Sequence, residues 1–83
     1  MRETLIEFFK TLREDCETNN VEFDFKIHLI GLEKSLTFKM SKDLKVTILG
    51  DGIIIKEFDK DGKVEYRTAI SYSDISYVSD GLL

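Results

Sequence analysis

The sequence predicts an α+β domain in which one N-terminal helix packs on a bent antiparallel sheet or small barrel of five to six strands. Three observations lead to this prediction. Apolar residues recur at helical spacing in residues 2–17, apolar and polar residues then alternate strictly in residues 21–30, and short alternating segments with glycine and aspartate turns follow. Because the chain has 83 residues, we expect one domain that spans residues 1–83.

Residues 2–17 have the pattern of an amphipathic helix. Four apolar residues fall at positions i, i+4, i+7 and i+11 and should form its buried face: Leu5, Phe9, Leu12 and Cys16. Thr4 and Glu7 have the spacing of a capping box, which predicts that helical winding begins only after Thr4. Asn19 or Asn20 should end the helix in the left-handed conformation.

Residues 21–30 form the clearest strand of the chain. Five apolar residues should line its buried face: Val21, Phe23, Phe25, Ile27 and Leu29. The residues between them are polar, as expected for a strand with one face in water. We therefore expect the other elements to pack around this strand.

Further strands are predicted at residues 34–40, 44–49, 53–58, 63–71 and 75–78. The turns between them are short, which predicts a meander of antiparallel neighbours. Ile53, Ile54 and Ile55 leave the register of their strand open, because either face could be buried. The strand at residues 63–71 should place four side chains on one face: Val64, Tyr66, Thr68 and Ile70.

The net charge of −4 is concentrated at the two ends of the chain. Residues 1–20 and the last ten residues each carry −2, and the segment between them is neutral. A broad nucleic-acid surface would show a basic excess, so nucleic acid is not the favoured partner. A lone cysteine, Cys16, indicates a reducing, cytoplasmic location, and the sequence has no apolar run of membrane-spanning length.

The residues that could carry catalysis are few and do not form a pattern. His28 is the only histidine, and it is expected on the exposed face of its strand, where a surface residue explains it. Cys16 lies on the apolar helix face, where a buried structural residue explains it. No metal-ligand spacing or phosphate-binding loop is present. We therefore expect no enzymatic activity, no metal site and no cofactor.

Two groups of residues are candidates for contact with a partner. The first is the charged helix face: Glu3, Glu7, Lys10 and Glu14. The second lies along residues 66–77 and contains all three tyrosines of the chain: Tyr66, Arg67, Thr68, Ser71, Tyr72, Asp74 and Tyr77. Tyrosine and arginine dominate binding hot spots, although strand edges also favour tyrosine for packing.

Two short segments resemble known families. Residues 70–78, ISYSDISYV, resemble the I-P-Y-S-D-I-x-x-V segment of pleckstrin-homology-like and GRAM-type barrels, with Ser71 in place of the proline. Residues 66–71, YRTAIS, are similar to the Y-K-H-A-I-S segment of Sm-like proteins of the Hfq type. There, Thr68 takes the place of a histidine that contacts RNA. These resemblances imply a small barrel that binds a nucleotide, RNA or a phosphorylated ligand near Arg67, Thr68, Ser71 and Tyr72.

The favoured hypothesis is a small non-enzymatic protein-binding module, an inhibitor or adaptor such as a phage-encoded inhibitor of a host protein. The alternative is the Sm-like or PH-like barrel that binds an anionic ligand. A third possibility is an oligomer, from a homodimer upward, built by edge pairing through residues 32–40. A protein partner is expected first, a nucleic acid or nucleotide second, and a membrane not at all.

Overall fold

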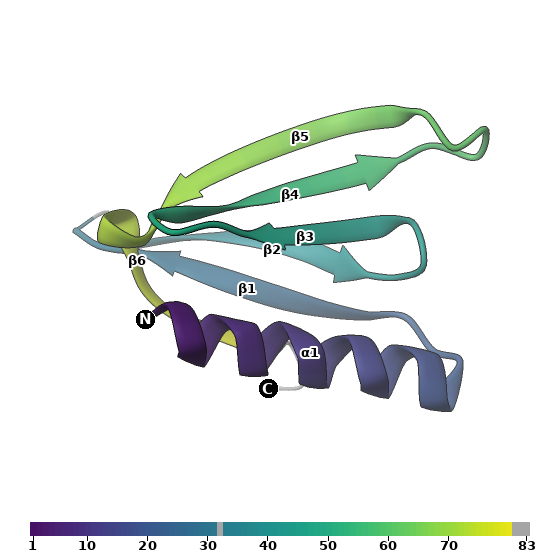
Figure 1. The fold of residues 1–83 in the computed structure, drawn as a ribbon, viewed down its shortest axis with the longest axis horizontal. Coiled ribbons are helices and arrows are strands. Elements are labelled where there is room, and N and C mark those ends of the chain that lie inside the picture. The colour runs from purple at the N-terminus through teal and green to yellow at the C-terminus, as the bar shows by residue number, and fades with distance from the viewer. Residues whose placement is uncertain (32, 81–83) are drawn as a thin grey trace.

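The computed structural model describes residues 1–31 and 33–80, and it has one helix followed by six strands (Figure 1). The elements are α1 (Arg2–Asn19), β1 (Phe23–Leu29), β2 (Lys34–Met40), β3 (Leu44–Ile48), β4 (Gly52–Phe58), β5 (Val64–Ser71), a 3-10 turn η1 (Tyr72–Asp74) and β6 (Ile75–Asp80). The predicted α+β class is confirmed. Within these residues, no helix combines the length and apolar character needed to cross a membrane.

The strands form two antiparallel sheets of three strands each. Sheet A has the order β2-β1-β6, and sheet B has the order β3-β4-β5. The sheets do not close into a barrel, and the prediction of a simple meander is wrong, because β6 returns to pair with β1. This return buries Ile75 at 2% exposure, and the backbone N–H of Ile30 donates to the carbonyl of Asp74 at 3.0 Å.

Helix α1 begins at Arg2, as the range 2–17 predicted, and the later start that the capping box suggested is wrong. Its N-cap residue, Met1, makes no side-chain cap, and the carbonyl of Met1 accepts the first helical hydrogen bond from the N–H of Leu5 at 3.0 Å. The predicted left-handed residue at the end of the helix is confirmed: it is Asn20, which has φ 51°. The helix extends to Asn19, two residues beyond the predicted end.

β1 is the central strand of sheet A, as expected of the clearest strand in the sequence. It is shorter than predicted, because the chain is still leaving the helix at Val21 and is already turning at Ile30. These two side chains are 49% and 57% exposed. Leu32, the first residue of the predicted pairing edge, lies outside the described residues, and β2 is an outer strand of sheet A.

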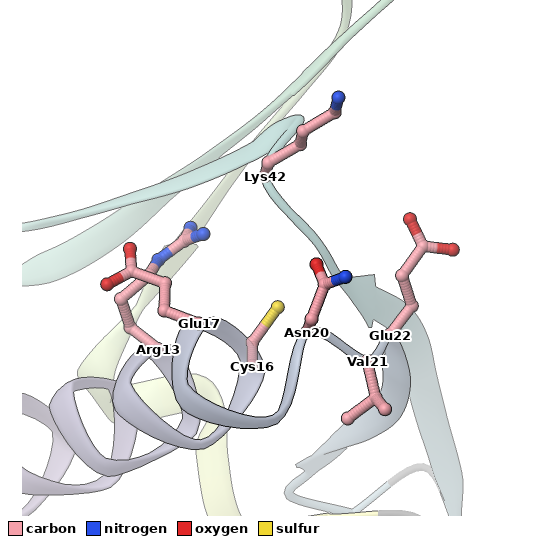
Figure 2. A pocket seen from close by; sticks show the side chains of 7 residues that line it. All are labelled: Arg13, Cys16, Glu17, Asn20, Val21, Glu22 and Lys42. Carbon is pink, nitrogen blue, oxygen red and sulfur yellow. The ribbon is translucent and has the colours of Figure 1, made fainter.

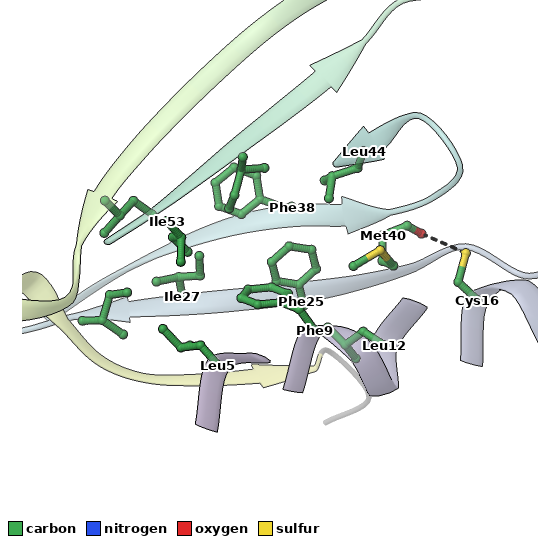
Figure 3. Packing of buried hydrophobic residues seen from close by; sticks show 13 residues of the cluster. Leu5, Phe9, Leu12, Cys16, Phe25, Ile27, Phe38, Met40, Leu44 and Ile53 are labelled. Carbon is green, nitrogen blue, oxygen red and sulfur yellow. Dashed lines mark hydrogen bonds between the residues drawn. The ribbon is translucent and has the colours of Figure 1, made fainter. Parts of the chain in front are cut away.

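The core lies between the sheets and α1, and it is closed by the helix, which contacts both β2 and β3 (Figure 3). The predicted apolar face of the helix is buried throughout. At the centre, the fully buried ring of Phe25 packs edge-on against Phe9 at 5.4 Å and stacks on Phe38 at 5.5 Å between ring centroids. One helix residue and two strand residues are thereby joined in one aromatic cluster.

Sheet B settles the register that the sequence left open. Ile53 and Ile55 are buried at 1% and 0% exposure, and Ile54 lies on the outer face. On β5, the prediction of one shared face holds for Tyr66, Thr68 and Ile70 but is wrong for Val64, because a register shift places Val64 opposite Phe58. Of these residues only Ile70 is buried. Val64 and Tyr66 are 39% and 60% exposed, because the β4–β5 hairpin extends beyond the core (Figure 1).

Two glycines of the β3–β4 turn provide a test of this packing. A Cβ added at Gly52 would lie 2.5 Å from the carbonyl oxygen of Ile70, whereas one added at Gly50 would meet nothing within 4 Å. We expect Gly52→Ala to lower the free energy of unfolding by about 1–3 kcal/mol, because the β4–β5 ladder must shift. Gly50→Ala should leave it unchanged or raise it by about 0.4–1 kcal/mol. Urea unfolding followed by circular dichroism measures both, and equal losses would contradict the packing.

Candidate functional site

The exposed face of α1 carries the candidate helix residues together. Glu3, Glu7, Lys10 and Glu14 are all exposed and follow one another at the same spacing as the buried residues, but on the opposite side of the helix. Glu17 continues this row one turn further and is also exposed. We call these five residues the acidic stripe. Helical spacing alone was sufficient to predict four of its members.

Arg13 is half-buried beside Glu17, and backbone carbonyls hold its side chain. Its guanidinium donates to the carbonyl of Ser41 at 2.8 Å and to the carbonyl of Leu44, at the corner where the chain passes from β2 to β3. Without Arg13, the exposed charges of α1 are five carboxylates and two bases, a net charge of −3. Nothing in the sequence distinguishes Arg13 in this way, because it is one of three basic residues on the helix.

Three acids of α1 lie near its C-terminal end, where acidic side chains are least favourable. Glu14, Asp15 and Glu17 lie in its C-terminal part, and its last turn contains no basic residue. The C-terminal end of a helix carries partial negative charge, so acids there are unfavourable by about 0.3–1 kcal/mol each near the end. The placement of these acids therefore lowers the stability of the helix.

A pocket of about 550 Å³ lies at this end of α1 (Figure 2). Its lining combines charges of both signs with one thiol: Arg13, Cys16, Glu17, Asn20, Val21, Glu22 and Lys42. The Cys16 side chain is only 7% exposed, and its thiol lies 3.8 Å from the carbonyl oxygen of Met40, to which it donates. Cys16 is therefore a packed residue, as predicted, and the pocket lies beside the end of the acidic stripe.

The candidate residues at 66–77 do not form one site. Tyr66 and Thr68 lie on the inner face of sheet B, and Arg67 lies on its outer face. Ser71 and Tyr72 flank the start of η1, where the Tyr72 hydroxyl donates to the carbonyl of Leu49. Asp74 ends η1, and Tyr77 lies on β6 in sheet A. Alternation and the change of sheet separate residues that are close in sequence.

The register of sheet B creates a group that the sequence did not reveal. Lys45, Lys56 and Arg67 are directly opposite one another on three adjacent strands, and we call them the cation row. Thr47, Ile54 and Ala69 form the next row of the same face. Like charges directly opposite in a sheet repel one another, so the cation row is unfavourable in the isolated chain.

His28 has partners that its own strand did not indicate. Its ring stacks on Tyr77 of β6 at 3.9 Å between centroids and 13° between planes, and its Nε2 lies 3.0 Å from the Ser79 hydroxyl. The register of β1 with β6 brings these residues together, and no local pattern could have predicted that. The group gives the outer face of sheet A a fixed aromatic pair.

Within residues 1–31 and 33–80, no group of three or more His, Cys, Asp or Glu side chains could hold a metal ion. Comparison of the chain with known protein families, with curated proteins and with solved structures finds no match. The resemblances to PH-like and Sm-like barrels therefore stay predictions.

The role of Arg13 can be tested by its removal. Arg13→Ala should lower the free energy of unfolding by about 1.5–3 kcal/mol, because the carbonyls of Ser41 and Leu44 lose a charged donor. The control is Lys10→Ala, an exposed cation three residues earlier on the same helix, which should change it by less than about 0.5 kcal/mol. Chemical unfolding measures the free energy of unfolding of both variants. Equal losses in the two variants would show that Arg13 acts only as a surface charge.

Proposed function

We propose that this protein is a small non-enzymatic protein-binding module, an inhibitor or adaptor, that uses the acidic stripe of α1 to bind a basic surface of another protein. The observation that carries the proposal is the charge of this face. The acidic stripe exposes four carboxylates and one base, a net charge of −3.

The cost of this arrangement supports a binding role. Acids near the C-terminal end of α1 lower the stability of the helix, and a sequence shaped by stability alone would place lysine or arginine there. Residues that break a local rule without a structural gain are expected at functional surfaces. Opposite charge on a partner would favour rapid and oriented encounter.

The wider identification belongs to the same proposal. A phage-encoded inhibitor of a host protein would fit a module of this size and surface. A cytoplasmic location would suit the free, buried thiol of Cys16, because such thiols persist in reducing compartments.

The stripe can be tested by a change that moves stability and binding in opposite directions. Glu14→Gln with Glu17→Gln should raise the free energy of unfolding by about 0.3–1 kcal/mol, because the repulsion from the helix end is relieved. The same variant should retain less of a protein that the wild-type chain captures from a lysate of its source cells. Thermal unfolding and quantitative capture measure the two effects.

Two controls accompany this experiment. Glu3→Gln, in the first turn of α1, should slightly lower stability, since acids are favoured at that end. Asp51→Asn with Asp61→Asn, in the turns of sheet B, should leave capture unchanged. Capture that survives in the helix variant would overturn the assignment of the stripe.

A second candidate function is the binding of a phosphate-bearing ligand at the outer face of sheet B. The cation row favours it, because three positive side chains on neighbouring strands form a compact site for an anion. Of the residues that the resemblances implied, Arg67 belongs to the cation row, and Ser71 lies opposite Gly52 at the far end of the same face, so the candidate site is the cation row rather than the whole segment at residues 67–72.

Titration with inorganic tripolyphosphate at low salt tests this second candidate. We expect saturable binding that weakens as salt is added and that falls about fivefold to tenfold in Arg67→Ala and in Lys45→Ala. Lys60→Ala, in the β4–β5 turn, is the matched control and should bind as the wild type does. No binding at low salt would rule the site out.

A further inference from the structure

β3 is an outer strand of sheet B, and one of its edges is not used by its neighbour β4. At one end of the β3–β4 ladder, the N–H of Phe58 donates to the carbonyl of Asp43 at 2.8 Å. At the other end, the N–H of Leu49 donates to the carbonyl of Gly52 at 2.8 Å. The register between them is continuous, so the odd-numbered residues bond β4 and the even-numbered residues turn their N–H and C=O groups to the opposite edge.

Arg13 shows that this second edge faces α1. The carbonyl of Leu44, the first even-numbered residue of β3, accepts a hydrogen bond from the guanidinium of Arg13. Val46 and Ile48 follow on the same edge, and none of the hydrogen bonds formed within residues 1–31 and 33–80 ends on their edge N–H and C=O groups. Two donors and two acceptors can therefore bond a further strand.

A groove of about 280 Å³ lies between this edge and α1. Five apolar side chains from the helix, from β2 and from β3 line it: Ile6, Phe9, Met40, Val46 and Ile48. A strand added to β3 would thus bond the edge and cover apolar side chains at the same time. Both contributions are typical of grooves in which extended peptides bind.

The charge of the groove selects the kind of segment that fits it. The charged residues that line it are Lys10, Arg13 and Lys45, all of them basic. Lys45 alternates with Val46 and lies on the outer face of sheet B, where a side chain opposite it on an added strand would meet it. Opposite charges at such a position stabilise a pair of strands.

We propose that this groove binds an extended segment of another protein, which adds to β3 as an antiparallel strand. The pattern of the segment follows from β3. It carries apolar residues opposite Val46 and Ile48, a β-branched residue such as threonine opposite Thr47, and an acid opposite Lys45. From its N-terminus, the segment reads apolar, threonine, apolar, acid. The antiparallel direction is the more stable one for a strand pair, and it is the direction of every pair in this fold.

This inference goes beyond the proposed function and stands without it. Glu14→Gln with Glu17→Gln, the variant that tests the acidic stripe, should bind such a segment within a few-fold of wild type. Arg67→Ala, which should weaken tripolyphosphate binding at the cation row, should leave binding of the segment unchanged. Failure of one proposal is therefore distinguishable from failure of the others.

A synthetic peptide of sequence Ser-Val-Thr-Val-Glu, amidated at its C-terminus and labelled with fluorescein, provides the test. We expect saturable binding to the wild-type chain, measured by fluorescence anisotropy at low salt. N-methylation of both valines should weaken binding by at least about tenfold, because the amides of these residues bond β3. The matched control is N-methylation of the threonine, whose amide points away from β3, and this peptide should bind within a few-fold of the unmodified one.

An exchange of charge tests the register. Lys45→Glu should weaken binding of the glutamate peptide by about threefold to tenfold, and it should strengthen binding of a peptide with lysine in place of the glutamate by a similar factor. Lys60→Glu, in the β4–β5 turn, is the matched control and should bind both peptides as the wild type does.

Val46→Pro removes a donor from the free edge alone. Proline is accepted in an edge strand where its missing N–H faces outward, so the ladder with β4 should survive, and circular dichroism confirms that the variant is folded. We expect it to bind the peptide at least about fivefold more weakly. Absence of binding to the wild-type chain would overturn the proposal. A valine-methylated peptide that binds as tightly as the unmodified one would also overturn it, because the groove would then take an apolar anion without strand pairing.

Discussion

The chain passes from sheet A to sheet B at the corner between β2 and β3, so the arrangement of the two sheets depends on this corner. β2 belongs to sheet A and β3 to sheet B, and within the corner between them the N–H of Leu44 donates to the carbonyl of Ser41 at 3.3 Å. The guanidinium of Arg13 reaches the carbonyls of Ser41 and Leu44, and the Ser41 hydroxyl accepts the N–H of Asp43 at 3.1 Å. Arginine suits this position because its planar group donates in several directions and remains charged.

The same interaction determines the character of the opposite face of the helix. A helix with three bases and five acids would be only mildly acidic if all of them faced water. Because Arg13 is half-buried at the corner, the fully exposed charges of α1 are five acids and two bases. One side chain thus contributes to the corner and is absent from the fully exposed charges of the helix.

The parts of the structure that depend on local spacing could be predicted, and the parts that depend on long-range pairing could not. The buried face of α1, the acidic stripe and the alternating faces of β1 follow from periodicity within one segment. The cation row and the His28–Tyr77 pair require knowledge of which strands are neighbours and in which register. The candidate residues at 66–77 do not lie together, because alternation turns adjacent residues to opposite faces and the chain then passes to the other sheet.

The ends of β1 show a further limit of periodicity. Val21 continues the apolar alternation of Phe23 and Phe25 but is half exposed, because the left-handed Asn20 redirects the chain just before it. The pattern of side chains extends beyond the segment whose backbone can join the sheet. Boundaries are therefore set by the conformation of the flanking turns.

The pairing of β6 with β1 imposes an order on the assembly of the fold. β1 ends at Leu29 and β6 begins only at Ile75, so sheet A is completed by one of the longest-range contacts in the chain. Sheet B, by contrast, is made of consecutive hairpins and needs no residue beyond Ser71. Contacts distant in sequence form more slowly than local ones, because a longer loop must close first. During synthesis, sheet B can form as soon as its three strands have left the ribosome. The edge of β1 that pairs with β6 stays unpaired until β6 has been made.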